Sequence, residues 1–210
     1  MNIKEAYNKW SEQYDANENK TRDLEALALI ETVADYTFQN CLEVGCGTGK
    51  NTGFLLTRAN HITAIDLSAE MLAKAKQKIQ SSKVDFQQFD ITNEWNFTNK
   101  KFNLVTFSLI LEHIENLDDI FEKVVKIIAP GGLIYIGELH PFKQYAGSKA
   151  RFETDEGLQV VTCYNHNVSE FINAAKKNGF YLETIHEYFD DRYKVNIPRV
   201  LAMLFKYNQF

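Results

Sequence analysis

Three glycines at alternate positions, Gly45, Gly47 and Gly49, follow a short apolar run in this sequence. Glycine allows the backbone to turn tightly and to approach a bound molecule without a Cβ atom in the way. The run before the glycines, residues 41–44, is typical of a buried strand and contains one carboxylate, Glu43. A helix after such a turn offers free N–H groups and the positive end of its dipole to a ligand. By itself the pattern also fits a plain strand-to-helix turn.

Two aspartates are the last residues of the next two predicted strands, Asp66 of residues 61–66 and Asp90 of residues 83–90. A carboxylate at the position of Asp66 can accept hydrogen bonds from both hydroxyls of a ribose. Either aspartate alone could instead be a helix cap or a turn former. Because ligands bind at the carboxyl ends of parallel strands, we expect Glu43, the glycine loop and both aspartates on one rim. The sequence therefore predicts a nucleoside-binding site.

The elements that must position these residues alternate between strand and helix. Helices are predicted at 22–38, 49–59, 68–79, 117–128 and 168–178, and strands at 41–44, 61–66, 83–90, 102–111, 133–139, 180–189 and 199–208. This alternation predicts an α/β fold with a doubly wound, mostly parallel seven-stranded sheet and helices on both faces. The short connection between the last two strands indicates that one of them runs antiparallel.

Several residues predict where these helices begin and end. Ser68 and Asn116 are expected as N-caps, and Asn167 with Glu170 has the spacing of a capping box. The segment Pro130-Gly131-Gly132 is expected to stop the helix before the fifth strand.

The composition limits the classes of function. The chain has 210 residues, 45% hydrophobic, and a net charge of −5, with a pI near 5.6. We expect one domain over residues 1–210, and the acidic balance disfavours a nucleic-acid partner. No apolar run approaches the roughly 20 residues that span a bilayer. Three cysteines without a CxxC pair or a His/Cys cluster predict no metal site, and we expect an unanchored cytoplasmic protein.

Five segments resemble the motifs of one enzyme family in order and spacing. EVGCGTG at 43–49 resembles motif I of class I S-adenosylmethionine-dependent methyltransferases, and AIDLSAEMLAKA at 64–75 is similar to their second motif. Three further segments resemble later motifs of the family: FDI at 89–91, FSLILEHI at 107–114 and APGGLIYIGE at 129–138. The resemblance covers roughly residues 1–190, most tightly 40–140, and is to the small-molecule branch. It implies the Rossmann-like methyltransferase fold.

The resemblance also implies a cofactor, S-adenosyl-L-methionine, which leaves as S-adenosyl-L-homocysteine. Gly45 and Gly47 would pass beneath its methionine part, with Glu43 organising the loop and facing the ammonium group. Asp66 would hold the ribose hydroxyls, and Asp90 would accept from the adenine amino group. The other residues implied in cofactor binding are Tyr14, Cys46, Leu67, Met71, Ile91, Ser108 and Leu109. Among these, Leu67, Met71 and Ile91 would line the adenine, and Ser108 and Leu109 would offer carbonyl groups to the ammonium.

Three histidines are the candidate catalytic residues. Methyl transfer from a sulfonium is an in-line displacement, so alignment carries most of the catalysis and a base is not always needed. His113 follows the fourth predicted strand, where the family often has a histidine near the cofactor pocket, and His140 follows the fifth. His166 precedes the next helix. A structural or surface role is the alternative for each, and Glu112 is expected to be a solvated helix residue.

Two segments are candidate walls for a substrate. Residues 1–21 carry an aromatic stripe at helical spacing, which resembles the N-terminal lid of the family or simply packs on the core: Tyr7, Trp10 and Tyr14. The other is an insertion at 140–166. Its cations are expected to be a solvated charge run unless they attract an acidic substrate: Lys143, Lys149 and Arg151.

The function predicted from these observations is methyl transfer to an oxygen or nitrogen of a small organic molecule. The alternatives are a methyltransferase acting on a protein or RNA, a nicotinamide-dependent oxidoreductase, and a binding module without turnover. The oxidoreductase is disfavoured because the loop at 45–49 is GxGxG and not GxGxxG, and because Glu43 and Asp90 would repel a pyrophosphate. We expect no nucleic-acid or membrane partner and a monomer or homodimer. The sequence leaves open the identity of the acceptor.

Overall fold

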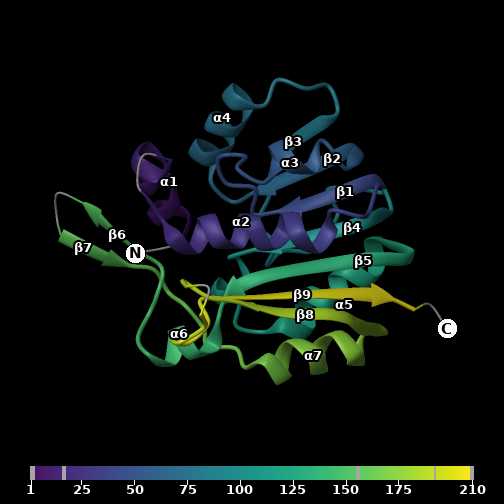
Figure 1. The fold of residues 1–210 in the computed structure, drawn as a ribbon. Helices are drawn as coiled ribbons and strands as arrows, with labels where there is room; N and C mark the ends of the chain where they lie inside the picture. Colours follow the sequence, from purple (N-terminus) through teal and green to yellow (C-terminus); the bar gives the residue numbers. More distant parts are fainter. Residues whose placement is uncertain (1–2, 16–17, 155–156, 192, 209–210) are drawn as a thin grey trace.

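The computed structural model describes residues 3–15, 18–154, 157–191 and 193–208. Its centre is a seven-stranded sheet in the order β3-β2-β1-β4-β5-β9-β8 (Figure 1). The strands are β1 (Phe38–Val44), β2 (Ala59–Asp66), β3 (Val84–Gln88), β4 (Phe102–Ser108), β5 (Ile128–Leu139), β8 (Phe180–Tyr188) and β9 (Val200–Tyr207). Strand β9 runs antiparallel to both β5 and β8, and the other neighbouring pairs are parallel. The predicted mixed sheet is confirmed, and its order reverses between β1 and β4.

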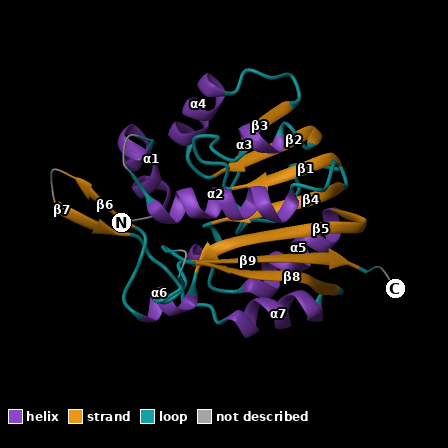
Figure 2. Ribbon diagram, in the orientation of Figure 1, coloured by secondary structure: helices purple, strands orange, loops and turns teal. Residues whose placement is uncertain are grey.

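Helices cover both faces of the sheet (Figure 2). One face packs against α2 (Lys20–Val33), α3 (Thr52–Leu55) and α4 (Ala69–Lys78), whose buried residues share a cluster with Cys41 and Tyr135. The other face packs against α5 (Leu117–Ile127) and α7 (Val168–Lys177). Because successive strand residues point to opposite faces, Leu42 and Val44 face α5 while Cys41 faces α2.

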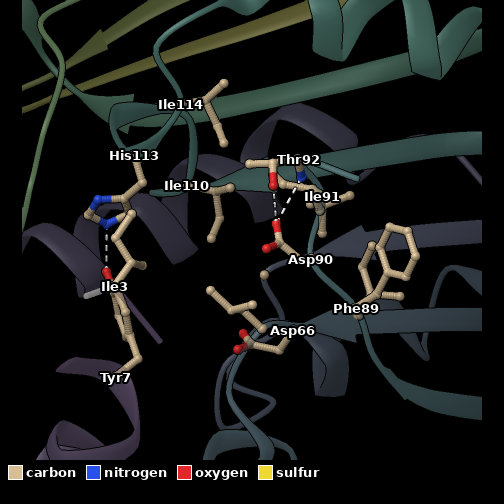
Figure 3. A pocket seen from close by; sticks show the side chains of 14 residues that line it. Ile3, Tyr7, Asp66, Phe89, Asp90, Ile91, Thr92, Ile110, His113 and Ile114 are labelled. Carbon is tan, nitrogen blue, oxygen red and sulfur yellow. Dashed lines mark hydrogen bonds between the residues drawn. The ribbon is translucent and has the colours of Figure 1, made fainter. Parts of the chain in front are cut away.

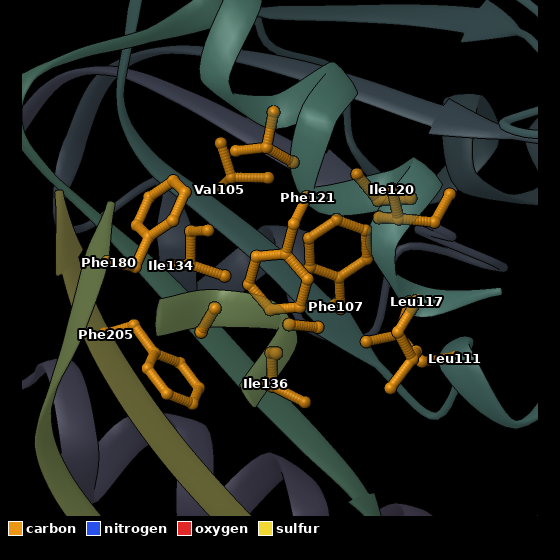
Figure 4. Close-up of a cluster of buried hydrophobic side chains, with 14 of the residues drawn as sticks. Val105, Phe107, Leu111, Leu117, Ile120, Phe121, Ile134, Ile136, Phe180 and Phe205 are labelled. Atoms are coloured by element: carbon orange, nitrogen blue, oxygen red, sulfur yellow. The ribbon is translucent and has the colours of Figure 1, made fainter. Parts of the chain in front are cut away.

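An aromatic group lies at the centre of the α5-side core (Figure 4). The ring of Phe121 on α5 lies 5.8 Å from that of Phe180 and 6.2 Å from that of Phe205, with edge-to-face geometry. Phe121 is almost fully buried, and burying such a side chain contributes about 1.5–3 kcal/mol. This packing fixes β8 and β9 against the parallel part of the sheet.

The predicted helix caps are confirmed, and one predicted stop is wrong. The side chains of Ser68 and Asn116 accept backbone N–H groups of α4 and α5, and the capping box of α7 is present. The segment Pro130-Gly131-Gly132 does not end a helix, because α5 ends at Ile127 and these residues lie inside β5. They form an irregularity in the pairing with β4, where Gly131 has φ +70°.

Two predicted helices are shorter in the structure. The helix expected at 49–59 is the four-residue α3, since β2 already begins at Ala59. The helix expected to reach residue 38 ends at Val33, because Phe38 begins β1.

Two segments lie beside the carboxyl ends of the parallel strands. Helix α1 (Ile3–Tyr14) packs against α4, and the segment after β5 contains α6 (Pro141–Tyr145) and a hairpin of β6 (Arg151–Thr154) and β7 (Gly157–Val160). Ala6 and Trp10 of α1 form a small apolar cluster with Val161, against which Ala150 packs. None of the described helices is long and apolar enough to cross a bilayer.

Candidate functional site

The glycine loop after β1 folds back onto the end of β2. The N–H groups of Gly45 and Cys46 donate to the carbonyl oxygen of Ile65, at 2.8 and 3.0 Å. All three glycines have positive φ, which favours glycine. A Cβ atom on Gly45 would lie 2.0 Å from the side chain of Ile110, whereas one on Gly47 would have no atom within 4 Å. Gly45 is therefore required by packing, and Gly47 borders open space.

A cavity of about 200 Å³, here called the Asp66 cavity, lies between this loop, the ends of β2, β3 and β4, and α1 (Figure 3). Oδ2 of Asp66 accepts the N–H of Gly47 and Oδ1 accepts that of Ser68, both at 2.8 Å. Burial raises the pKa of Asp66, while these backbone N–H groups lower it. Oδ1 of Asp90 accepts the N–H and the hydroxyl of Thr92, at 2.9 and 2.6 Å. Both carboxyl groups are thus held in fixed orientations beside the cavity.

The remaining walls of the Asp66 cavity are mostly apolar. They include Leu67 and Ile91 among the expected residues, and also Ile3, Phe89 and Ile110. Such walls suit a flat ring. Met71 is not among the residues that line this cavity: it is buried, and its N–H donates to Ser68 Oγ as part of the cap of α4.

A second, smaller cavity of about 50 Å³ lies on the other side of the loop, and we call it the glycine-loop cavity. Among the expected residues it is lined by Tyr14, Glu43, Gly45, Cys46, Gly47, Ser108 and Leu109. The side chain of Glu43 is 4% exposed and accepts a hydrogen bond of 2.6 Å from Thr52 Oγ1. Burial raises the pKa of Glu43 to about 8, although the Thr52 hydrogen bond lowers it.

Arg22 is a residue of the glycine-loop cavity that the sequence did not single out. Its guanidinium carbon lies 4.0 Å from the centre of the Tyr14 ring, and Nη1 donates to the carbonyl oxygen of Tyr14. A second buried carboxylate, Glu25, accepts from Asn51 and from the hydroxyl of Tyr135. The cavity thus brings carboxyl groups and a guanidinium together, which is an arrangement for a ligand that carries both charges.

A third cavity of about 360 Å³, here called the acceptor-side cavity, lies between α1, residues 18–22 and residues 148–150. It shares Tyr7 with the Asp66 cavity, and it shares Tyr14, Arg22 and Leu109 with the glycine-loop cavity. Leu109 has φ +57°, uncommon for a residue other than glycine, and its N–H donates to the carbonyl of Gly137. The three cavities therefore adjoin along the end of β4.

His113 is the one of the three candidate histidines that lines the Asp66 cavity. Its Nδ1 lies 2.9 Å from the carbonyl oxygen of Thr162, and its Nε2 lies 2.8 Å from the hydroxyl of Tyr7. Because a carbonyl only accepts, Nδ1 carries the hydrogen, and Nε2 of the neutral ring accepts from Tyr7.

The structure does not bring His140 or His166 to these three cavities. His140 is 1% exposed and caps α6: its Nδ1 accepts the N–H of Phe142 at 3.2 Å, and its Nε2 lies 3.0 Å from Glu187 Oε1. Burial lowers the pKa of His140, while Glu187 raises it. His166 donates from Nε2 to the carbonyl oxygen of Ile114 at 2.7 Å. The geometry thus supports structural roles for both.

Glu112 is not the solvated residue that we expected. It lies in a short 3-10 helix, η1 (Leu111–His113), is 6% exposed and lines the acceptor-side cavity. Burial raises its pKa, while a hydrogen bond from Cys163 lowers it. The carboxyl group of Glu138 fixes this turn by accepting the N–H groups of Ile110 and Leu111, at 2.9 and 2.7 Å. Within the described part of the chain, no group of three or more His, Cys, Asp or Glu residues is placed to hold a metal ion.

The chain is similar in sequence to known methyltransferases. A family model described as a methyltransferase domain matches residues 42–136. The chain is 27% identical to an uncharacterized methyltransferase of Emericella nidulans, over 84% of this chain and 74% of that protein. It is 32% identical to a malonyl-[acyl-carrier protein] O-methyltransferase of Haemophilus ducreyi, over 54% of this chain and 45% of that protein. The chain therefore spans less than half the length of the second relative.

A solved structure shares the fold along the whole chain. The N-methyltransferase NodS from Bradyrhizobium japonicum, in complex with S-adenosyl-L-homocysteine, superposes with a TM-score of 0.74 at 16% identity and covers 100% of both chains.

Proposed function

We propose that this chain is a class I S-adenosylmethionine-dependent methyltransferase, as its similarity to methyltransferases supports, and that it methylates an oxygen or nitrogen of a small organic molecule. The proposal rests on one observation: the acceptor-side cavity adjoins the glycine-loop cavity, because Tyr14 and Leu109 line both. A nucleophile in the first cavity can there approach a methyl group held in the second.

The residues of the Asp66 cavity fit the nucleoside half of the cofactor. Both oxygens of Asp66 accept from the backbone and keep lone pairs for the ribose hydroxyls. Asp90, fixed by Thr92, would accept from the adenine amino group between the apolar walls of Leu67 and Ile91. Gly47 borders open space, which a larger side chain at this position would fill.

The residues of the glycine-loop cavity fit the amino-acid half of the cofactor. Arg22 would bind its carboxylate, and Glu43 would face its ammonium group, with the carbonyl groups of Ser108 and Leu109 at the end of β4. When bound, the cofactor supplies an electrophilic methyl group on a sulfonium. A positively charged ligand favours the ionised form of a buried carboxyl group, whereas a pyrophosphate disfavours it, so Glu43 suits an ammonium group better than the nicotinamide alternative.

The N-terminal segment 1–21 would act as a lid and residues 140–166 as the second wall within one methyltransferase domain. Tyr7, Trp10 and Tyr14 roof the acceptor-side cavity, so they would exclude water and orient the acceptor. A roofed cavity of about 360 Å³ suits a small molecule better than an RNA or a protein side chain. The three cysteines are free, which suits the cytoplasmic location that we propose.

A two-step experiment tests the proposed function. Metabolites are first screened for a thermal shift of the protein saturated with S-adenosylhomocysteine, and hits are then assayed for transfer of tritiated methyl groups from S-adenosylmethionine. We expect at least one small-molecule acceptor and no consumption of NADPH with any hit. Methyl transfer to RNA or protein fractions without transfer to any small molecule would contradict the proposal.

A further inference from the structure

The acceptor-side cavity carries an excess of positive charge. Its lining includes four cations, Lys20, Arg22, Lys149 and Arg199, and two acids, Glu18 and Glu112. These give a formal charge of +2 in a chain whose net charge is −5. A concave site with one sign of charge attracts ligands of the opposite sign.

The cations differ in whether a neighbouring acid already neutralises them. Nη2 of Arg199 lies 2.7 Å from Asp190 Oδ2, and Nη1 donates to Thr21. Arg22 also lines the glycine-loop cavity, where the proposed function assigns it to the cofactor. Among the described side chains, Lys149 forms no ion pair, whereas Lys143 in the same insertion lies 3.4 Å from Asp190. Lys149 therefore contributes a positive charge that no described acid offsets.

The two acids of the cavity offset less of its positive charge than their formal charges indicate. Burial raises the pKa of Glu112, which disfavours its charged form. Glu18 is exposed to solvent, as Lys20 and Lys149 are, so screening weakens these three charges alike and leaves the excess of cations. The positive character of the cavity therefore persists beside Lys149.

The position of Lys149 is tied to the aromatic roof. The next residue, Ala150, packs on the cluster of Ala6, Trp10 and Val161, and its carbonyl oxygen accepts the N–H of Val161 at 3.0 Å. The ring centres of Trp10 and Tyr14 lie 5.1 Å apart. The cavity thus combines an aromatic wall with a cation whose backbone is fixed next to it.

We propose that the methyl acceptor carries an oxyanion, a carboxylate or a phosphate-type group, which Lys149 binds while the body of the acceptor lies against Trp10 and Tyr7. This inference rests on the proposed function and names the substrate class of the same site. The cation holds one end of the acceptor, so the other end can reach the rim formed by Tyr14 and Leu109.

Four small aromatic probes of matched shape test this inference: benzoate, phenylphosphonate, the neutral benzamide and the cationic benzylamine. Each is titrated by calorimetry into the full-length protein saturated with S-adenosylhomocysteine, at low and high salt. The variants are Lys149→Gln and, as a matched control, Lys9→Gln, because Lys9 is an exposed lysine of α1 that lines none of the three cavities.

We expect benzoate or phenylphosphonate to bind more tightly than benzamide and benzylamine, with an affinity that falls as salt rises. Lys149→Gln should weaken the anion about fivefold, the upper end for a solvent-accessible ion pair, and Lys9→Gln should not. Preference for carboxylate or for phosphonate identifies which oxyanion the site takes. Equal binding of benzoate and benzamide, preference for benzylamine, or no binding of either anion would overturn the inference. Failure to bind S-adenosylhomocysteine would instead overturn the proposed function.

Discussion

The hydroxyl group of Tyr7 donates a hydrogen bond of 2.8 Å to Nε2 of His113. The same imidazole donates from Nδ1 to the carbonyl oxygen of Thr162, so one ring joins α1, the turn after β4 and the end of the insertion. Burial raises the pKa of Tyr7, which keeps its hydroxyl protonated as a donor. The two walls of the acceptor-side cavity are therefore linked through His113.

Tyr7→Phe should loosen the lid without removing its aromatic packing. The lost hydrogen bond is worth about 1 kcal/mol, so we expect faster amide exchange in residues 3–14 and weaker binding of S-adenosylhomocysteine. Tyr188→Phe is the matched control, because its hydroxyl donates to Glu31 at 2.9 Å, outside the three cavities. Hydrogen exchange measured by mass spectrometry checks this prediction. Identical exchange in wild type and Tyr7→Phe would contradict a role of the Tyr7–His113 hydrogen bond in holding the lid.

Glu43 should make the cofactor-free protein less stable as the pH rises. Its folded pKa of about 8 lies above the ordinary 4.5, so the folded state retains a proton that the unfolded chain loses. The free energy of unfolding therefore falls between about pH 4.5 and 8, by on the order of a few kcal/mol from this group. Chemical denaturation across this range should show a smaller fall for Glu43→Gln than for wild type. Parallel pH profiles of the two proteins would contradict a buried, protonated Glu43.

His140→Ala should lower stability rather than catalysis. The change removes the cap of α6 and the contact with Glu187, and loss of a cap costs about 1 kcal/mol. His140→Asn keeps a side-chain acceptor for the N–H of Phe142 and should restore most of the melting temperature. Thermal melting and methyl transfer are measured for both variants. Loss of transfer at an unchanged melting temperature would show that His140 does take part in the reaction.

Gly47→Leu should prevent cofactor binding, and Gly147→Leu provides its control. Both glycines have positive φ, +53° and +91°, and both have open space around an added Cβ. The backbone strain is therefore comparable, but Gly47 alone of the two borders the glycine-loop cavity. Calorimetric titration with S-adenosylhomocysteine should detect binding to Gly147→Leu and none to Gly47→Leu. Equal affinity in both would mean that the space above Gly47 is not used.

The rim of the sheet could be predicted from the sequence because its geometry follows from local patterns. Asp66 ends β2 and Asp90 lies two residues after β3, and the carboxyl ends of parallel strands meet at one edge. The Asp66 cavity accordingly brings both aspartates to the glycine loop.

The other site residues depend on contacts between segments that are distant in the sequence. The sequence predicts His140 at the rim, but the five-residue α6 that His140 caps has no periodic signal, and its partner Glu187 comes from β8. The place of Arg22 depends on how Tyr14 of α1 lies over α2. Glu112 is buried because the chain near Tyr164 crosses it, with a hydrogen bond of 2.7 Å to its carbonyl oxygen.

Titration of S-adenosylhomocysteine into the wild type, Asp66→Asn and Asp85→Asn tests the central claim most directly. Asp85 is an exposed aspartate of β3 outside the three cavities and serves as the control. The account predicts binding to the wild type, unchanged binding to Asp85→Asn, and a loss of about 1.5–3 kcal/mol in Asp66→Asn, because hydrogen bonds to a charged acceptor are removed. No binding to the wild type, or equal affinity in Asp66→Asn, would contradict it.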